Sequence, residues 1–151
     1  MQKLAPFLIA LAVNAQAPAY PPPYQPPYQA VGTMSQLMID IIYPTSDAIF
    51  YIERTPPKTE VDWEHIRQNA LTLAESANLL MLPSRARDND KWMADAKLLL
   101  DAGKAAYSAA MAKDMQAMVN LNSNLYNACV TCHMDYRSNY GRRPLNTAPK
   151  K

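Results

Sequence analysis

Glycine is almost absent from this chain, and its scarcity limits the possible folds more than any other feature. Only three of the 151 residues are glycine, whereas β-sandwiches and barrels need many tight turns in which glycine supplies positive φ. Hydrophobic residues make up 49% of the chain and charged residues 19%, so a packed core is possible and wholesale disorder is not expected. The composition and length therefore predict a single all-α domain.

The charge pattern argues against nucleic acid as a partner. Lysine and arginine total 15, aspartate and glutamate total 13, and the two signs are interspersed, which gives a net charge of +2. A nucleic-acid-binding domain would normally carry a basic stripe or patch.

Residues 1–15 have the pattern of a secretory signal peptide. Lys3 supplies the positive start, residues 4–13 form a short apolar run, and Ala15 ends a small-residue cleavage site. The run is shorter than the roughly 20 residues that span a bilayer, although an uncleaved membrane anchor stays open as the alternative. We therefore expect a protein that is exported to the periplasm and not stably inserted in a membrane.

Residues 16–30 form an arm of proline, tyrosine, glutamine and alanine. Six prolines lie between Pro18 and Pro27, so this arm is expected to be an extended polyproline II segment, serving as a spacer or as a docking motif. The folded domain is expected at residues 31–143, with a tail at 144–151.

Two helical patterns precede the middle of the chain. The first is expected from Ala30 or Val31 to Ile52, with a kink or a restart at Pro44 that Thr45 or Ser46 would cap. The second begins at a capping-box-like pair, Thr59 and Asp62, and ends at Pro83. Its predicted buried positions are Val61, Ile66, Ala70, Leu73, Ala77 and Leu80.

Two further helical patterns follow a polar loop at residues 84–89. The predicted buried positions of the third helix are Trp92, Ala96, Leu99, Gly103, Ala106 and Ala110. Asp114 is expected to cap the fourth helix, whose apolar stripe is Met118, Leu121, Leu125, Ala128, Cys132 and Tyr136. Four amphipathic helices with short connections predict an antiparallel up-down-up-down four-helix bundle.

Residues 129–133 read Cys-Val-Thr-Cys-His, the pattern of covalent c-type haem attachment. Cys129 and Cys132 are three residues apart and share a helix face, so both thiols can reach the two vinyl groups of one porphyrin. His133 follows at once and can bring an imidazole nitrogen to the iron. The expected cofactor is one haem c, held near the end of the C-terminal helix through two thioethers.

Three other interpretations of the two cysteines are a zinc site, a redox-active dithiol-disulfide site, and a chance occurrence of the motif. A zinc site normally needs four nitrogen or sulfur ligands, and the chain has only one other histidine, His65, expected to be exposed. A redox dithiol normally follows a strand in a thioredoxin-like fold. Both cysteines of the chain fall in the motif, which makes coincidence the weakest explanation.

The stretch from Cys129 to Arg137, Cys-Val-Thr-Cys-His-Met-Asp-Tyr-Arg, resembles the C-terminal helix of class II c-type cytochromes. This family comprises cytochrome c′ and its low-spin cytochrome c556-type relatives. The resemblance implies that Cys129 and Cys132 hold the haem and that His133 is the proximal iron ligand. Family members often form dimers through their first two helices, so a homodimer is possible. Arg137 follows His133 by one helical turn and could pair with a haem propionate at the haem edge.

The sixth iron ligand separates two functions. Counting about seven residues inward from each end of two antiparallel helices places Met38 level with His133, with Met34 one turn earlier as the alternative. Methionine opposite histidine gives low-spin iron suited to single-electron transfer between redox partner proteins. An open sixth position would instead suit a five-coordinate, cytochrome c′-like protein that binds NO or CO. The sequence shows no catalytic constellation, so we do not expect an enzyme.

Overall fold

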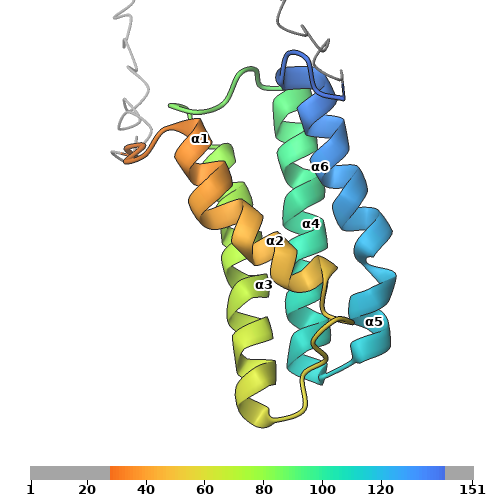
Figure 1. Ribbon diagram of the computed structural model, residues 1–151. Coiled ribbons are helices and arrows are strands. Elements are labelled where there is room, and N and C mark those ends of the chain that lie inside the picture. The colour runs from red at the N-terminus through yellow and green to blue at the C-terminus, as the bar shows by residue number, and fades with distance from the viewer. Residues whose placement is uncertain (1–27, 142–151) are drawn as a thin grey trace, which may run out of the picture.

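The computed structural model describes residues 28–141, and every regular element in that range is a helix (Figure 1). In chain order the elements are α1 (Met34–Gln36), η1 (Leu37–Ile42), α2 (Tyr43–Phe50), α3 (Glu60–Leu80), α4 (Lys91–Ala112), α5 (Met115–Asn120) and α6 (Asn122–Tyr136). The first three are continuous, and Leu121 alone separates α5 from α6, so the elements make four packed helical segments. The predicted all-α helical bundle is confirmed at this level.

The predicted signal peptide at 1–15, most of the proline-rich arm at 16–30 and the tail at 144–151 lie outside the described residues. Among the residues that the structure does describe, no helix combines the length and the apolar character needed to cross a membrane.

The first helical segment begins at Met34, so the predicted start at Ala30 or Val31 is wrong. Thr33 sets the start because it forms a capping box with Gln36. The Thr33 hydroxyl accepts a hydrogen bond from the Gln36 N–H at 3.2 Å, and the Gln36 side chain accepts one from the Thr33 N–H at 2.9 Å. This exchange satisfies backbone donors that the first turn leaves free. The segment ends at Phe50 rather than at the predicted Ile52.

Pro44 neither ends this segment nor restarts it. The turn before it is a π-helix, η1, in which the Tyr43 N–H donates to the Met38 carbonyl five residues earlier. A single π-helical turn often occurs where the regular hydrogen bonding of an α-helix is disturbed. Here it precedes Pro44, which has no backbone N–H to donate.

The predicted capping by Thr45 or Ser46 is also wrong. The Thr45 hydroxyl donates to the Ile41 carbonyl at 2.7 Å, and the Ser46 hydroxyl donates to the Tyr43 carbonyl at 2.9 Å. Both hydroxyls therefore donate to carbonyl groups earlier in the chain. An N-cap side chain would instead accept a hydrogen bond from a backbone N–H two or three residues later.

Helix α3 starts where the sequence predicts. The Thr59 hydroxyl accepts from the Asp62 N–H at 3.2 Å, and the Asp62 carboxylate accepts from the Thr59 N–H at 2.8 Å. Most of the predicted buried face is correct, but Val61 is 62% exposed. The fully buried residues of α3 all lie between Ala70 and Leu80, so the first turn of the helix contributes no core position.

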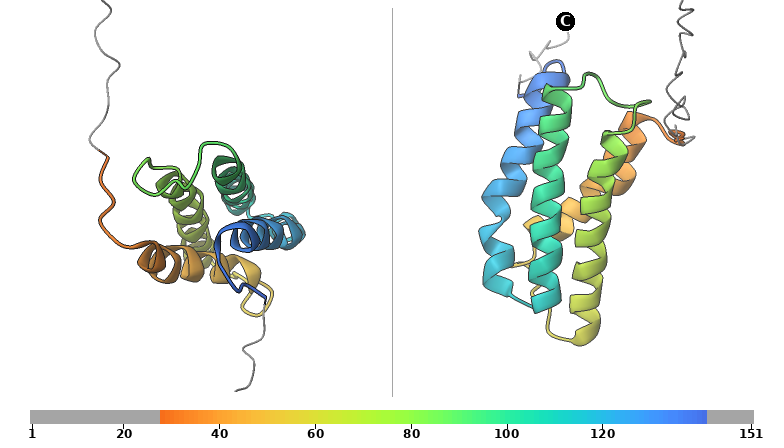
Figure 2. Two further views of the ribbon diagram at one scale, coloured as in Figure 1. Left: turned by 90° about the horizontal axis from the view of Figure 1, so that it is seen from above. Right: turned by 180° about the vertical axis from the view of Figure 1, so that it is seen from behind.

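Helices α3 and α4 lie side by side and have the most extensive contact in the bundle (Figures 1 and 2). All six predicted buried positions of α4 are buried. Gly103 allows the closest approach, because a Cβ atom placed there would lie 2.7 Å from both the Cα and the backbone nitrogen of Ala74. Small side chains at this interface therefore set the distance between the two helices.

The fourth predicted helix is divided into α5 and α6 at Leu121. Asp114 caps α5 as predicted, because its carboxylate accepts from the Ala117 N–H at 2.9 Å. Of the predicted apolar stripe, three residues are buried (Met118, Leu125 and Ala128) and three are half-buried (Leu121, Cys132 and Tyr136).

The C-terminal end of α6 lies against the N-terminal end of α4. The Tyr136 ring meets the Trp92 ring edge-on, with 4.9 Å between centroids, and the Tyr136 hydroxyl donates to Asp88. Lys91 pairs with Asp135 at 2.7 Å. The Trp92 indole N–H donates to the Leu80 carbonyl at the end of α3, at 2.8 Å. These contacts join three helix ends at one end of the bundle.

We predict that Gly103→Ala destabilises the protein by about 1–2 kcal/mol. The added methyl group meets the backbone of Ala74, and overpacking of this kind costs about 1–3 kcal/mol, while replacing helical glycine gains back up to about 1 kcal/mol. Urea unfolding measures the difference. Ser108→Ala, at an exposed position of the same helix, is the control and should stay within about 0.5 kcal/mol of the parent. A Gly103→Ala variant as stable as the parent would contradict this prediction, because it would show that α3 and α4 can move apart at Gly103 without a loss of stability.

Candidate functional site

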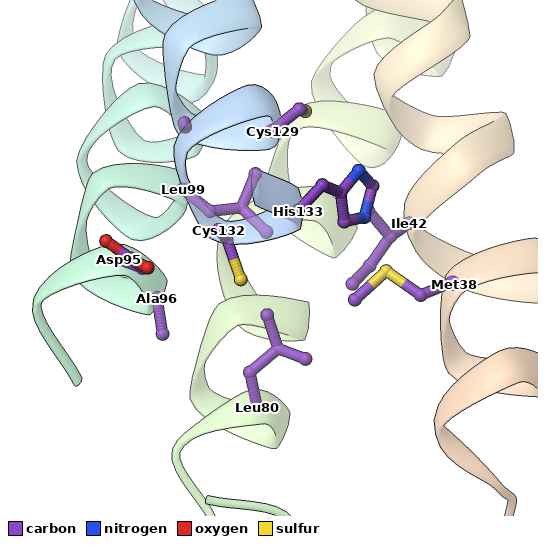
Figure 3. Close-up of a pocket in the computed structure, with 10 residues that line it drawn as sticks. Met38, Ile42, Leu80, Asp95, Ala96, Leu99, Cys129, Cys132 and His133 are labelled. Atoms are coloured by element: carbon purple, nitrogen blue, oxygen red, sulfur yellow. The ribbon is translucent and has the colours of Figure 1, made fainter. Parts of the chain in front are cut away.

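A small cavity of about 40 Å³ lies between η1, α3, α4 and α6 (Figure 3). Its lining is mostly apolar and consists of Met38, Ile42, Leu80, Asp95, Ala96, Leu99, Ala128, Cys129, Cys132 and His133. The structure thus brings four residues singled out from the sequence, Cys129, Cys132, His133 and Met38, to the same cavity from two distant parts of the chain.

Cys129 and Cys132 are half-buried free thiols on the cavity face of α6. Burial raises the pKa of the Cys129 thiol. Burial, followed by the charges of Asp95 and Asp135, raises the pKa of the Cys132 thiol to about 11. Both groups are therefore protonated thiols at neutral pH, held one helical turn apart toward the same space.

The His133 side chain is half-buried and points toward the η1 side of the cavity (Figure 3). Burial first, and the positive charge of Arg137 second, lower the pKa of the His133 imidazole. The neutral form is the one that can bind a metal ion through nitrogen. The ring of Tyr140 lies beside it, with 5.0 Å between the two ring centroids.

Met38 reaches the same cavity from η1. Its thioether extends from η1 toward His133 in the close-up view (Figure 3), and the residue is half-buried. Met34, the alternative from the sequence, is also half-buried and packs against the core, but it does not line this cavity. The structure therefore distinguishes the two methionines, because Met38 lines the cavity and Met34 does not.

Arg137 is exposed and does not line the cavity. It ends α6, where its backbone N–H donates to the His133 carbonyl at 3.0 Å, and its guanidinium lies 5.8 Å from the centre of the Tyr140 ring. Its predicted pairing with a haem propionate stays a prediction. His65 is exposed on α3, as expected, and does not line the cavity either.

Asp95 is the cavity residue that the sequence analysis missed. It is 4% exposed, and its Oδ2 atom is buried with no hydrogen-bond partner within residues 28–141. Burial is the main cause of its raised pKa, and the charge of Asp135 is the second. The signal was present in the sequence, because Asp95 follows Trp92 by three residues and directly precedes Ala96 on the apolar face of α4.

The side chains at the cavity match in chemistry the protein groups that hold a covalently attached haem. Two thiols spaced for two thioethers, an imidazole and a methionine thioether are the protein groups that hold c-type haems, and the remaining walls are mainly aliphatic, as a porphyrin ring requires. Within residues 28–141, no three or more histidine, cysteine, aspartate or glutamate side chains gather as a candidate site for a metal ion.

Comparisons with protein-family models, with curated proteins and with solved structures found no match for this chain.

In haem-free protein, we predict that the thiol of Cys132 reacts slowly with alkylating reagents. With a pKa of about 11, only about a thousandth of the thiol is thiolate at pH 8, and thiolate is the reactive form. In a Cys129→Ser variant, the alkylation rate should rise about tenfold per pH unit up to about pH 10. The same variant unfolded in urea is the control, and its rate should level off at lower pH. Equal pH profiles for folded and unfolded protein would contradict the buried environment of Cys132.

Proposed function

We propose that this protein is an exported, periplasmic monohaem c-type cytochrome that carries single electrons between redox partner proteins. The observation that carries the proposal is the common cavity shared by Cys129, Cys132, His133 and Met38. Residues 38 and 133 are far apart in sequence, so their meeting is not a consequence of the motif itself.

In this proposal each residue has a separate task. Cys129 and Cys132 would hold one haem through two thioethers, and His133 and Met38 would bind its iron. When bound, the haem supplies an iron atom that accepts and returns one electron. Aliphatic side chains such as those of Leu80 and Leu99 would give the haem an apolar surrounding.

The proposal includes an antiparallel up-down-up-down topology with the haem near the end of α6. It is supported by contacts between opposite helix ends. Lys91, the first residue of α4, pairs with Asp135 near the last turn of α6. Trp92 in the first turn of α4 bonds to Leu80, the last residue of α3.

Met38 favours electron transfer over the alternative of NO or CO binding at an open iron. The Met38 thioether reaches the same cavity as His133 and is available to fill the sixth position, and histidine–methionine ligation raises the reduction potential. The gas-binding alternative would require Met38 to stay a packing residue.

The first test is covalent attachment. Protein produced together with haem-maturation machinery should be heavier than its polypeptide by the mass of one haem, and the added mass should survive denaturation and acid-acetone extraction, because thioether bonds resist both. A Cys129→Ser, Cys132→Ser double variant is the matched control and should lose its haem on extraction. Release of the haem from the parent protein would overturn the covalent assignment.

The second test separates Met38 from Met34. Met38→Ala should convert the haem toward high spin and lower its reduction potential, because a thioether that stabilises reduced iron is lost. Met34→Ala should cost about 1–3 kcal/mol in stability through lost packing and leave the spin state unchanged. The far-red charge-transfer band of methionine-ligated ferric haem is the readout. Loss of this band in Met34→Ala, together with its persistence in Met38→Ala, would identify Met34 as the ligand and contradict the assignment of Met38.

A further inference from the structure

Asp95 lines the cavity together with two apolar residues of α4, Ala96 and Leu99, and its own carboxyl group is buried at the cavity wall. It lies on the α4 side of the cavity, across from Met38 on η1 (Figure 3). The residue is 4% exposed, and its Oδ2 atom has no hydrogen-bond partner among the described residues. Burying an ionised carboxylate without full hydrogen bonding is costly, so a role in the chemistry of the cavity would explain this placement.

The charges around Asp95 do not neutralise it. Lys91, one turn earlier on α4, is the nearby cation, but it pairs with Asp135 of α6 at 2.7 Å. Asp135 itself and Asp88, in the connection before α4, are both acidic and raise the pKa of Asp95, whereas Lys91 lowers it by less than burial raises it. Asp88 accepts a hydrogen bond from the Tyr136 hydroxyl of α6.

The other titratable groups that line the cavity all come from α6. They are Cys129, Cys132 and His133, and the proposed function uses each of them. Elements η1 and α3 contribute only uncharged side chains to the lining, namely Met38, Ile42 and Leu80. Asp95 is therefore the remaining group of the lining that can exchange a proton while the haem is in place.

We propose that Asp95 takes up one proton when the site takes up one electron, and releases it when the electron leaves. This inference rests on the proposed function. The electron comes from a one-electron donor, such as a reduced redox partner protein, and the proton comes from solvent. Oxidised haem iron carries one more positive charge than reduced iron, and in a low-dielectric cavity that charge favours the ionised form of a nearby carboxyl group.

The direction of the pH dependence follows from this coupling. Burial and Asp135 move the pKa of Asp95 upward, and loss of the positive charge on reduction moves it further upward. Between the pKa values of the oxidised and reduced states, reduction binds one proton. In that window the reduction potential falls with rising pH by at most about 59 mV per pH unit for one proton per electron.

The test is a spectroelectrochemical titration of the haem-loaded protein between about pH 4 and pH 9. Asp95→Asn keeps the shape of the side chain and removes the titration, so the slope expected in the parent should disappear. Asp101→Asn is the matched control, because Asp101 is a carboxylate on the same helix with a side chain 53% exposed. It should keep the slope. A slope that persists in Asp95→Asn would overturn the proposal.

A second measurement gives its first result on the parent protein, before any variant is needed. Infrared difference spectra between reduced and oxidised parent protein should show the C=O stretch of a protonated carboxylic acid appearing on reduction. Asp101→Asn should retain the band and Asp95→Asn should lose it. Covalent haem with a pH-independent potential and no such band would refute the role of Asp95 alone. Absence of covalent haem would refute the proposed function, and the role of Asp95 with it.

Discussion

The indole of Trp92 is the contact on which the placement of the site depends. It lies in the first turn of α4, donates to the last residue of α3, and packs against Tyr136 at the last residue of α6. One buried side chain thus fixes three helix ends relative to one another. Because an indole N–H must find an acceptor when buried, the bond to the Leu80 carbonyl also fixes how α3 ends.

The cavity lies next to this fixed end of the bundle. Leu80 both accepts the bond from Trp92 and lines the cavity, and His133 and Cys132 lie within one turn of Tyr136 on α6. The other side of the cavity comes from η1, the π-helical turn before Pro44. A proline at that position perturbs the backbone where Met38 and Ile42 must face the cavity, and π-helical turns often occur at functional sites.

Features encoded by neighbouring residues were predictable from the sequence. The capping box of Thr59 and Asp62 and the cap at Asp114 depend on bonds over three residues, and the buried face of α4 follows from spacing alone. The sequence also favoured Met38 over Met34, because counting residues from the ends of two antiparallel helices placed Met38 at the same height in the bundle as His133. In the structure both residues line one cavity. Its role as a ligand stays a prediction.

Features that depend on several elements were not predictable in the same way. The exposure of Val61 reflects where α3 begins to meet its neighbours, which periodicity does not encode. The environment of Asp95 arises from α4, α6 and the connection at residues 81–90 together. The π-helix at η1 depends on how Pro44 is accommodated, and the proline itself was compatible with a kink or a restart.

We propose that Met38 and His133 would be the two protein ligands of one haem iron. The most direct test is the absorption spectrum of the reduced, haem-loaded protein with and without carbon monoxide. Two protein ligands on the iron predict a sharp low-spin α-band that carbon monoxide leaves unchanged. A broad high-spin spectrum that shifts when carbon monoxide is added would contradict this account, because it would show that the position assigned to Met38 is open.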